Sequence, residues 1–102
     1  MMSVMNVEYT LHGLHFEWDS QKASANLHKH GISFETACEV FHDPFVQMVD
    51  EEVVDDEVRE AVVGMTVNWR LVYVVYVFRE EAVRIISTRL VTKAERKRYE
   101  EQ

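Results

Sequence analysis

The chain has 102 residues, of which 47% are hydrophobic, and this combination predicts one folded domain rather than a disordered chain. Its single cysteine, Cys38, excludes an internal disulfide, and no apolar run is long enough to span a membrane, so we expect a soluble cytoplasmic protein. The formal net charge of -7 argues against extended wrapping of nucleic acid, which requires many contacts to phosphates.

The chain begins with a segment that shows no helix or strand periodicity. We expect residues 1–13 to form a loose lead-in and residues 14–102 to form the single domain. Residues 14–18 alternate apolar and polar side chains, which is typical of a half-buried strand. The first regular element is therefore a short strand.

Two helices are predicted after this strand, separated by a short turn. Asp19 is placed to cap a helix over residues 20–30, and Gly31 follows it where left-handed backbone geometry is common. The apolar stripe of this helix is thin and consists of Ala23, Leu27 and His30. Residues 34–42 carry apolar side chains at helical spacing and precede Pro44, so they complete a helical hairpin.

The second half of the chain is rich in β-branched and aromatic residues and predicts a sheet. We expect its strands at residues 45–49, 58–67, 71–78 and 82–88. The acidic run 50–56 is assigned to a solvated loop, because like charges repel each other. Thr92 and Glu95 match a capping box and start a short helix that ends near Tyr99.

The connections between the later strands are short, which favours antiparallel pairing. The element order therefore predicts an α+β fold. An N-terminal strand and a helical hairpin pack on an antiparallel sheet of about four strands, and a short C-terminal helix follows.

Basic residues are concentrated near the C-terminus, although the whole chain is acidic. Residues 61–102 contain eight lysines and arginines and five acidic residues. Residues 43–60 contain one basic residue and eight acidic residues. The arginines on or beside the last two strands are Arg70, Arg79, Arg84 and Arg89. Because a guanidinium fork binds phosphate oxygens, several such side chains predict a phosphate-binding surface. The alternative is that each pairs with a carboxylate, such as Glu80, Glu81 or the acidic run.

The C-terminal helix carries the basic residues Lys93, Arg96, Lys97 and Arg98. They have two interpretations. Basic side chains near the end of a helix complement its dipole, and the same side chains can contact RNA or an acidic partner.

The five histidines do not predict a metal site. His28 and His30 project about 200° apart on a helix, and only one cysteine is available as a further ligand. We therefore expect no metal and no other cofactor. His30 is either a half-buried histidine with a hydrogen bond or a group that transfers protons, since histidine titrates near neutral pH. Trp18 is either a core residue or a platform on which a base stacks.

Four segments in this order and spacing resemble the BrnT family of type II toxins. They are Phe16-Glu17-Trp18-Asp19, Lys22 to Asn26, Lys29 to Glu35, and Arg84 to Arg89 followed by Glu95, Arg96 and Tyr99. The resemblance covers roughly residues 15–100. It implies a RelE-like fold and a ribonuclease that cuts RNA and inhibits translation. It also implies a ribbon-helix-helix antitoxin, BrnA, which neutralises the toxin in a complex with two copies of each chain. The complex binds its own operator DNA through the antitoxin.

The resemblance also assigns site residues. Carried over residue by residue, it selects Trp18, Lys22, His30, Arg84, Ser87 and Arg89. Thr88 stands where the family commonly has a small residue such as alanine.

The implied reaction is metal-independent: the 2′-hydroxyl of the RNA attacks the adjacent phosphorus. Candidates for binding the phosphate are Arg89, Arg84 and Arg79, and candidates for moving protons are Lys22 and His30. Trp18 would stack on a base, and Arg70 and Ser87 would contact the substrate. Because side chains alternate along a strand, Arg84 and Arg89 fall on opposite faces unless a bulge intervenes, and Arg89 is favoured.

Two other classes of function remain open. The chain could be a non-catalytic binding module, a corepressor that only docks a DNA-binding partner through its basic helix and arginine strand. A metal-binding structural domain is the third interpretation, and it predicts bound zinc in the purified protein.

Overall fold

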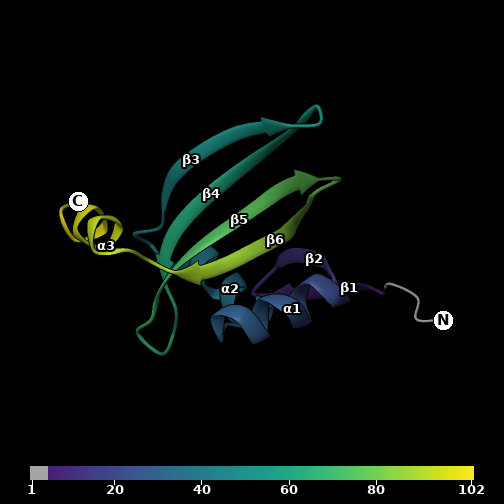
Figure 1. The fold of residues 1–102 in the computed structure, drawn as a ribbon, viewed down its shortest axis with the longest axis horizontal. Coiled ribbons are helices and arrows are strands. Elements are labelled where there is room, and N and C mark those ends of the chain that lie inside the picture. Colours follow the sequence, from purple (N-terminus) through teal and green to yellow (C-terminus); the bar gives the residue numbers. More distant parts are fainter. Residues whose placement is uncertain (1–4) are drawn as a thin grey trace.

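The computed structural model describes residues 5–102, which form a six-stranded sheet and the helices packed around it (Figure 1). The strands are β1 Asn6–Leu11, β2 Leu14–Asp19, β3 Gln47–Val54, β4 Glu57–Met65, β5 Leu71–Arg79 and β6 Ala82–Leu90, in the spatial order β1-β2-β6-β5-β4-β3. The helices are α1 Ser20–His30, α2 Phe34–Cys38, the 3-10 helix η1 Glu39–His42 and α3 Lys93–Glu100. The α+β class is confirmed. Residues 1–4 of the expected lead-in lie outside the described residues.

One strand pair makes the sheet mixed. β2 runs parallel to β6, with Phe16 opposite Val83 and Glu17 opposite Arg84, while the other neighbouring pairs are antiparallel. Parallel neighbours need a long crossover, and the helices and strands between β2 and β6 supply it. The prediction of an antiparallel sheet of about four strands is wrong in both respects, because short connections constrain only consecutive strands.

Strand β1 lies within the segment expected to be a loose lead-in. It pairs with β2 through a turn at His12 and Gly13, whose φ angles are 47° and 84°. Two successive positive φ angles match the twist of an antiparallel hairpin. Val7, Tyr9 and Leu11 alternate along β1 and pack against the core, so the sequence contained the signal.

The acidic run 50–56 forms part of the β3–β4 hairpin instead of a long loop. Its turn consists of Asp55 and Asp56, and the residues on either side pair as strands. β3 is an edge strand whose side chains are mostly exposed. Repulsion between the acidic side chains did not require a loop, because side chains on an exposed edge strand are also surrounded by water.

The helical hairpin has the predicted caps. Asp19 accepts hydrogen bonds from the backbone N–H groups of Gln21 (2.8 Å) and Lys22 (3.4 Å). Gly31 ends α1 with a φ of 71°, which an L side chain rarely adopts. The predicted second helix, residues 34–42, is present as α2 followed by η1.

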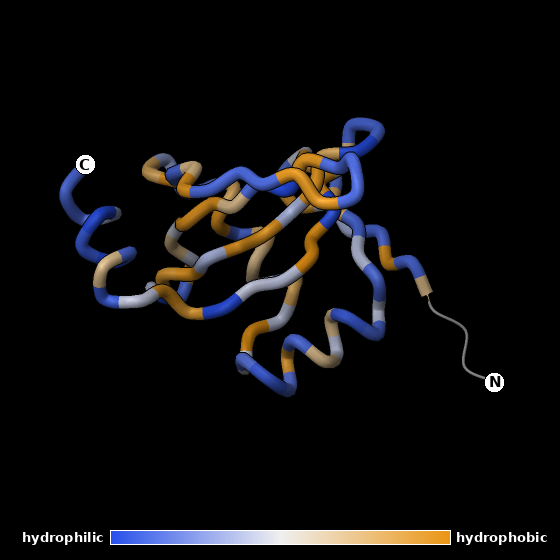
Figure 2. Tube along the Cα trace, turned by 45° about the horizontal axis from the view of Figure 1, so that its top comes forward, coloured by the Kyte–Doolittle hydropathy of each residue, from blue (hydrophilic) through white to orange (hydrophobic). Residues whose placement is uncertain are grey.

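The core lies between these helices and one face of the sheet. The apolar stripe predicted for α1 is right for Ala23, which packs against the core, and wrong for Leu27, which is 49% exposed; the buried residue is Asn26. α2 buries Phe34, Ala37 and Cys38. η1 approaches β4 so closely that a Cβ at Gly64 would lie 2.7 Å from the Cβ of Val40. Figure 2 shows orange, hydrophobic stretches along the sheet and a largely hydrophilic α3.

The opposite face of the sheet, called here the outer face, is turned away from α1 and α2. On β5, Tyr73 and Val75 point to it, and they alternate with the core residues Val72 and Val74. α3 follows β6 and lies at one end of the sheet (Figure 1). Within residues 5–102, none of the helices has the length and apolar character needed to cross a bilayer.

Candidate active site

A bulge in β6 decides where its arginines point. The register with β5 shifts here: Val75 lies opposite Ser87, but the next residue, Tyr76, lies opposite Ile85. Ile86 is therefore an extra residue without a partner, and an extra residue changes the phase of all side chains that follow it.

The bulge places Arg84 and Arg89 on the same face. Val83, Ile85 and Thr88 are buried, so the core-facing positions are spaced by two residues and then by three. Arg84 and Arg89 fall outside this set and point to the outer face. The expectation of opposite faces does not hold, because alternation is interrupted. The two residues are still roughly 15 Å apart along the strand, too far to hold one phosphate while each keeps its own partner.

Arg89 is held on the outer face by two side chains. Its terminal nitrogens donate hydrogen bonds of 2.8 and 2.9 Å to the two carboxylate oxygens of Glu95, and its guanidinium carbon lies 4.0 Å from the centre of the Tyr73 ring. The hydrogen bond from Arg89 lowers the pKa of Glu95 to about 2. Burial raises the pKa of Tyr73 above its ordinary value, so its hydroxyl remains a proton donor at neutral pH.

Glu95 also begins helix α3. Its Oε1 accepts a hydrogen bond from the backbone N–H of Thr92 (2.9 Å), while the Thr92 hydroxyl accepts one from the backbone N–H of Glu95 (3.2 Å). This is the predicted capping box, and it is confirmed. A single carboxylate therefore connects the start of α3 to Arg89.

The end of α3 is anchored by Tyr99. Its hydroxyl donates a hydrogen bond of 2.6 Å to Oδ2 of Asp43, which also accepts one from the backbone N–H of Met65 (2.7 Å). Burial and this hydrogen bond raise the pKa of Tyr99 to about 12. α3 thus has one polar anchor at each end.

Most of the predicted phosphate-binding arginines are already paired with carboxylates. The pairs are Arg79–Glu57, Arg84–Glu17 and Arg89–Glu95. Such pairs are the alternative left open by the sequence; Glu57 borders the acidic run, whereas Glu17 and Glu95 were not among the expected partners. Within residues 5–102 the side chain of Arg70, in the β4–β5 turn, has no ion pair.

A hollow of about 310 Å³ lies on the outer face beside Arg89. Tyr73, Ser87 and Arg59 line it, together with the acidic residues Asp50, Glu52 and Glu60. Its hydroxyl groups come from β5 and β6, whereas Arg59 and the carboxylates come from β3 and β4, where Arg59 lies opposite Glu52. A phosphate is therefore favoured only on the side of Tyr73 and Ser87, where Arg89 stacks on the Tyr73 ring.

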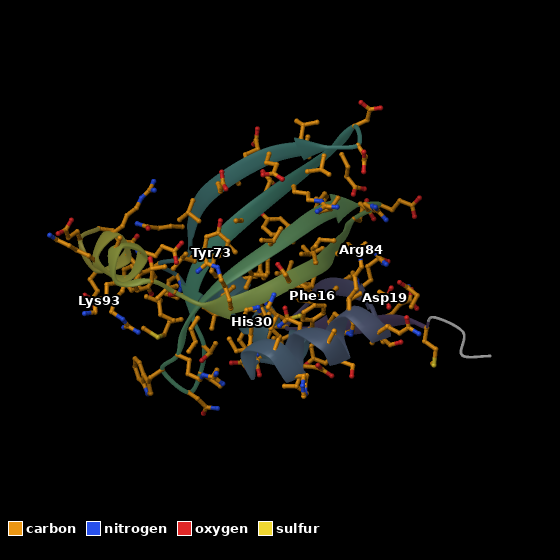
Figure 3. All side chains as sticks on the ribbon, viewed as in Figure 1. Phe16, Asp19, His30, Tyr73, Arg84 and Lys93 are labelled. Atoms are coloured by element: carbon orange, nitrogen blue, oxygen red, sulfur yellow. The ribbon has the colours of Figure 1, made fainter. Side chains whose placement is uncertain are left out.

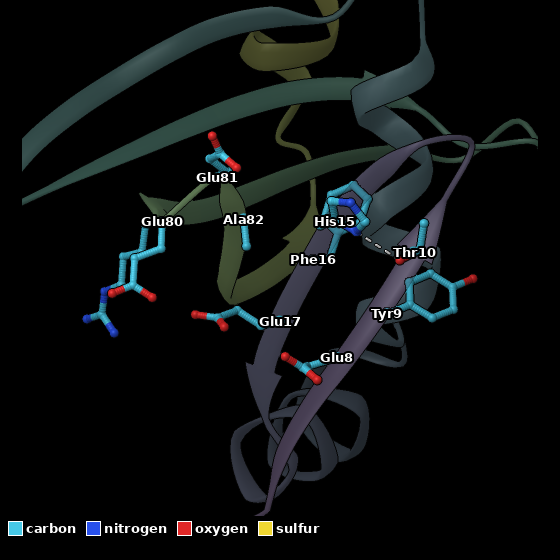
Figure 4. Close-up of a pocket in the computed structure, with 10 residues that line it drawn as sticks. Glu8, Tyr9, Thr10, His15, Phe16, Glu17, Glu80, Glu81 and Ala82 are labelled. Carbon is cyan, nitrogen blue, oxygen red and sulfur yellow. Dashed lines mark hydrogen bonds between the residues drawn. The ribbon is translucent and has the colours of Figure 1, made fainter.

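A larger hollow of about 410 Å³ lies beside the β1–β2 hairpin (Figure 4). Its lining includes Glu8, Glu17, Glu80 and Glu81. The single arginine there, Arg79, is already bound to Glu57. This hollow repels an anionic substrate in spite of its size.

Helix α1 continues alongside β6 in the same direction (Figure 1). The side chain of Asn26 replaces a neighbouring strand for Thr88: its Nδ2 donates to the Thr88 carbonyl (3.0 Å) and its Oδ1 accepts from the Thr88 N–H (3.1 Å). His30 lies one turn later on the same helix face and is half-buried. It is the last residue of α1, one turn beyond the contact of Asn26 with Thr88; Figure 3 labels it on this helix.

The structure separates Lys22 from His30. Lys22 is exposed in the first turn of α1, eight residues before His30 and about 12 Å back along the helix axis. Within residues 5–102, no hydrogen bond or ion pair joins Lys22 or His30 to Arg89. The two predicted proton carriers thus lie one turn to either side of Asn26 on α1, and His30 is the one that ends the helix.

Trp18 is a core residue. It is 2% exposed and packs against Phe34 and Tyr9, with ring centres 5.9 and 5.6 Å away. The prediction that it stacks on a base does not agree with this burial, because neither face of its ring is open to a ligand.

Residues 18–95 match the family model described as "Ribonuclease toxin, BrnT, of type II toxin-antitoxin system". The chain belongs to the BrnT family. The resemblance inferred from the four sequence segments is thereby confirmed, and membership implies an antitoxin partner.

The fold resembles a solved member of the BrnT family. The chain matches the 1.1 Å crystal structure of the Brucella abortus ribonuclease toxin BrnT with a TM-score of 0.52 and 22% sequence identity, over 74% of this chain and 94% of that chain. At this identity the likeness establishes the shared fold. A comparison with curated protein sequences gave no match.

Several residues of the BrnT-like segments have structural roles. Asp19 caps α1, Gly31 ends it, and Tyr99 anchors α3. Glu95 has two roles, since it caps α3 and binds Arg89. Resemblance alone therefore does not distinguish residues that contact a substrate from residues that hold the fold.

The sequence interpretation missed Tyr73, Asn26 and Trp69. Tyr73 was assigned only to an apolar strand, and its pairing with Arg89 across two strands has no local signal. Trp69 is 83% exposed in the β4–β5 turn, with a φ of 63°. An aromatic residue in a predicted turn was a signal for exposure. Within residues 5–102, no three side chains from histidine, cysteine and acidic residues are arranged to hold a metal ion.

Proposed function

We propose that this chain is the toxin of a toxin–antitoxin pair and that it cleaves RNA by attack of the 2′-hydroxyl on the adjacent phosphorus. One observation carries the proposal: Arg89 lies on the outer face, stacked on Tyr73, and Tyr73 lines a hollow on that face. The fold is proposed to be RelE-like, as the family resemblance implies.

Arg89 is proposed to bind the scissile phosphate. Negative charge builds on the phosphate oxygens as the 2′-oxygen attacks, and a guanidinium fixed nearby stabilises that charge more than it stabilises the ground state. Tyr73 and Ser87, at the rim of the same hollow, donate hydrogen bonds to these oxygens. Because the pKa of Tyr73 is raised, its hydroxyl serves as a donor and not as a base.

His30 is proposed to take the proton from the 2′-hydroxyl or to give one to the leaving 5′-oxygen. A histidine side chain exchanges protons near neutral pH, and acid–base assistance contributes roughly 10²–10⁴-fold to a rate. Lys22, Arg84 and Arg79 lie away from Arg89, whereas Arg70 precedes β5 at the same end of the sheet; all four are proposed to contact neighbouring phosphates. In this proposal, side chains alone bind the phosphate and transfer the protons, and the reaction needs no bound metal ion.

The partner is proposed to be a ribbon-helix-helix antitoxin of the BrnA kind. It would neutralise the toxin in a complex with two copies of each chain, and the complex would repress its own operon through the DNA-binding antitoxin. RNA cleavage in the cytoplasm would inhibit translation. The competing proposal, a corepressor without catalysis, predicts the same complex but no cleavage.

Purified protein incubated with single-stranded RNA in EDTA tests the proposal. We expect cleavage that leaves 2′,3′-cyclic phosphate ends, a loss of about 10²-fold or more in rate for Arg89→Ala, and none from RNA with 2′-deoxy sugars. Added antitoxin should stop the reaction. A folded wild-type protein that cleaves no RNA and does not arrest growth on expression, yet binds the antitoxin, would support the corepressor instead.

A further inference from the structure

Both terminal nitrogens of Arg89 bind one carboxylate in the free protein. The two hydrogen bonds to Glu95, 2.8 and 2.9 Å long, form the parallel pair that arginine also makes with a phosphate. Glu95 therefore occupies the edge of Arg89 that an RNA phosphate would use. We propose that Glu95 masks Arg89, and that RNA gains Arg89 only by displacing Glu95. This inference rests on the proposed function, because it assigns a regulation to the same site.

Helix α3, which carries Glu95, is attached in a way that permits displacement. It buries no residue. Its contacts near each end are polar: Glu95 with Arg89, Tyr99 with Asp43, and the Gln102 amide with the Phe45 carbonyl (2.7 Å). Moving the start of the helix therefore exposes no apolar core, and the cost is limited to hydrogen bonds that water can replace.

The mask selects for long RNA over single nucleotides. Glu95 is tethered a few residues from Arg89, so it competes at a high effective concentration, and one phosphate displaces it poorly. A longer strand gains additional contacts. Lys22 and Lys29 of the neighbouring α1 are exposed, and α1 contains no acidic residue. Contacts of this kind offset the loss of the Glu95–Arg89 pair.

Glu95→Gln tests the mask with little change to the helix. Glutamine also serves in a capping box, so α3 keeps its start while the charge that binds Arg89 is removed. Glu101→Gln is the matched control: it removes the same charge from the same end of the chain, where Glu101 lies 4.0 Å from Lys97 and both side chains are exposed. The probe is a single-stranded 2′-deoxy oligonucleotide of about ten nucleotides, which the proposed reaction cannot cleave.

We expect Glu95→Gln to bind the probe roughly fivefold more tightly than Glu101→Gln. One newly available phosphate contact should also steepen the dependence of log K on log salt by about 0.7. Adding Arg89→Ala to Glu95→Gln should remove the gain. Circular dichroism checks that α3 is intact, and Glu95→Ala, which loses the cap as well, must show the same gain.

The outcomes separate the mask from the proposed function. Binding by wild type and Glu101→Gln without a gain in Glu95→Gln overturns the mask alone. A gain that persists without Arg89 overturns it too, since the effect then comes from charge in general. If none of the variants binds the probe, the proposed function fails and the mask fails with it.

Discussion

α1 and α3 both border the end of β6 that carries Arg89, but they are attached to the sheet in opposite ways. α1 is fixed by the buried side chain of Asn26, which makes three hydrogen bonds to the backbone of Thr88 and Ile32. α3 buries no residue and depends on polar contacts at its two ends. The same strand end is thus supported by one rigid neighbour and one that can be released.

This difference assigns separate tasks to the two helices. α1 cannot move without leaving backbone groups of β6 unpaired inside the protein, which costs several kcal/mol. Its half-buried His30 is therefore held in a constant position. α3 can move at the cost of exposed or half-exposed hydrogen bonds, so the carboxylate it carries, Glu95, can leave Arg89. The buried Asn26 thus fixes α1, whereas α3, which buries no residue, is the helix proposed to regulate access to Arg89.

The largest expected effect concerns the rigid helix. Asn26→Ala removes the partners of the Thr88 N–H and of two carbonyls, and unpaired buried backbone groups destabilise a fold. We expect the free energy of unfolding to fall by about 3 kcal/mol, measured by urea denaturation.

Leu27→Ala is the control for this prediction. It lies next to Asn26 on α1 and loses more apolar volume, but its side chain is 49% exposed. We expect it to cost less than about 1 kcal/mol. A larger loss for Leu27→Ala than for Asn26→Ala would mean that α1 is held by apolar contacts after all.

Local rules predicted much of this scaffold from the sequence. Asp19, Gly31 and the Thr92–Glu95 pair act within one helical turn, so their roles could be inferred from spacing alone. The parallel pairing of β2 with β6 could not, because it joins residues that are distant in the chain. Asn26 was missed for the same reason: its partner Thr88 lies 62 residues away.

A smaller effect is expected at the released helix. Tyr99→Phe removes the hydrogen bond to Asp43, whose carboxylate keeps its bond from Met65. We expect a loss of about 1 kcal/mol in global stability and a larger relative loss of amide hydrogen-exchange protection in α3. Tyr9→Phe, on the β1–β2 hairpin, serves as control and should leave protection in α3 unchanged. Equal loss of protection in α1 and α3 after Tyr99→Phe would show that the two helices open together.

The candidate site was less predictable than the scaffold. Arg89 could be selected from the sequence, but its direction depended on the bulge at Ile86, which no residue type announces. Its stacking on Tyr73 required the strand register, and its ion pair required the start of α3. For Trp18 the general rule was the better guide: an aromatic residue in a strand is most often buried, and Trp18 is buried instead of being open to a base.

The smallest expected effect is the pH dependence of the released helix. The hydrogen bond from Arg89 lowers the pKa of Glu95 from an ordinary 4.5 to about 2 in the folded protein. A carboxyl group with a lowered folded pKa stabilises the fold fully above its unfolded pKa, and this contribution is lost as the pH falls from 4.5 towards 2. Because the pair is partly exposed, we expect wild type to exceed Glu95→Gln in stability at pH 7 by under about 1 kcal/mol, a difference that disappears in this acidic range. Urea denaturation of both proteins across this range measures it. Glu101→Gln should show no such convergence, and a wild-type advantage that persists at pH 2 would mean that Glu95 stabilises α3 by some means other than its charge on Arg89.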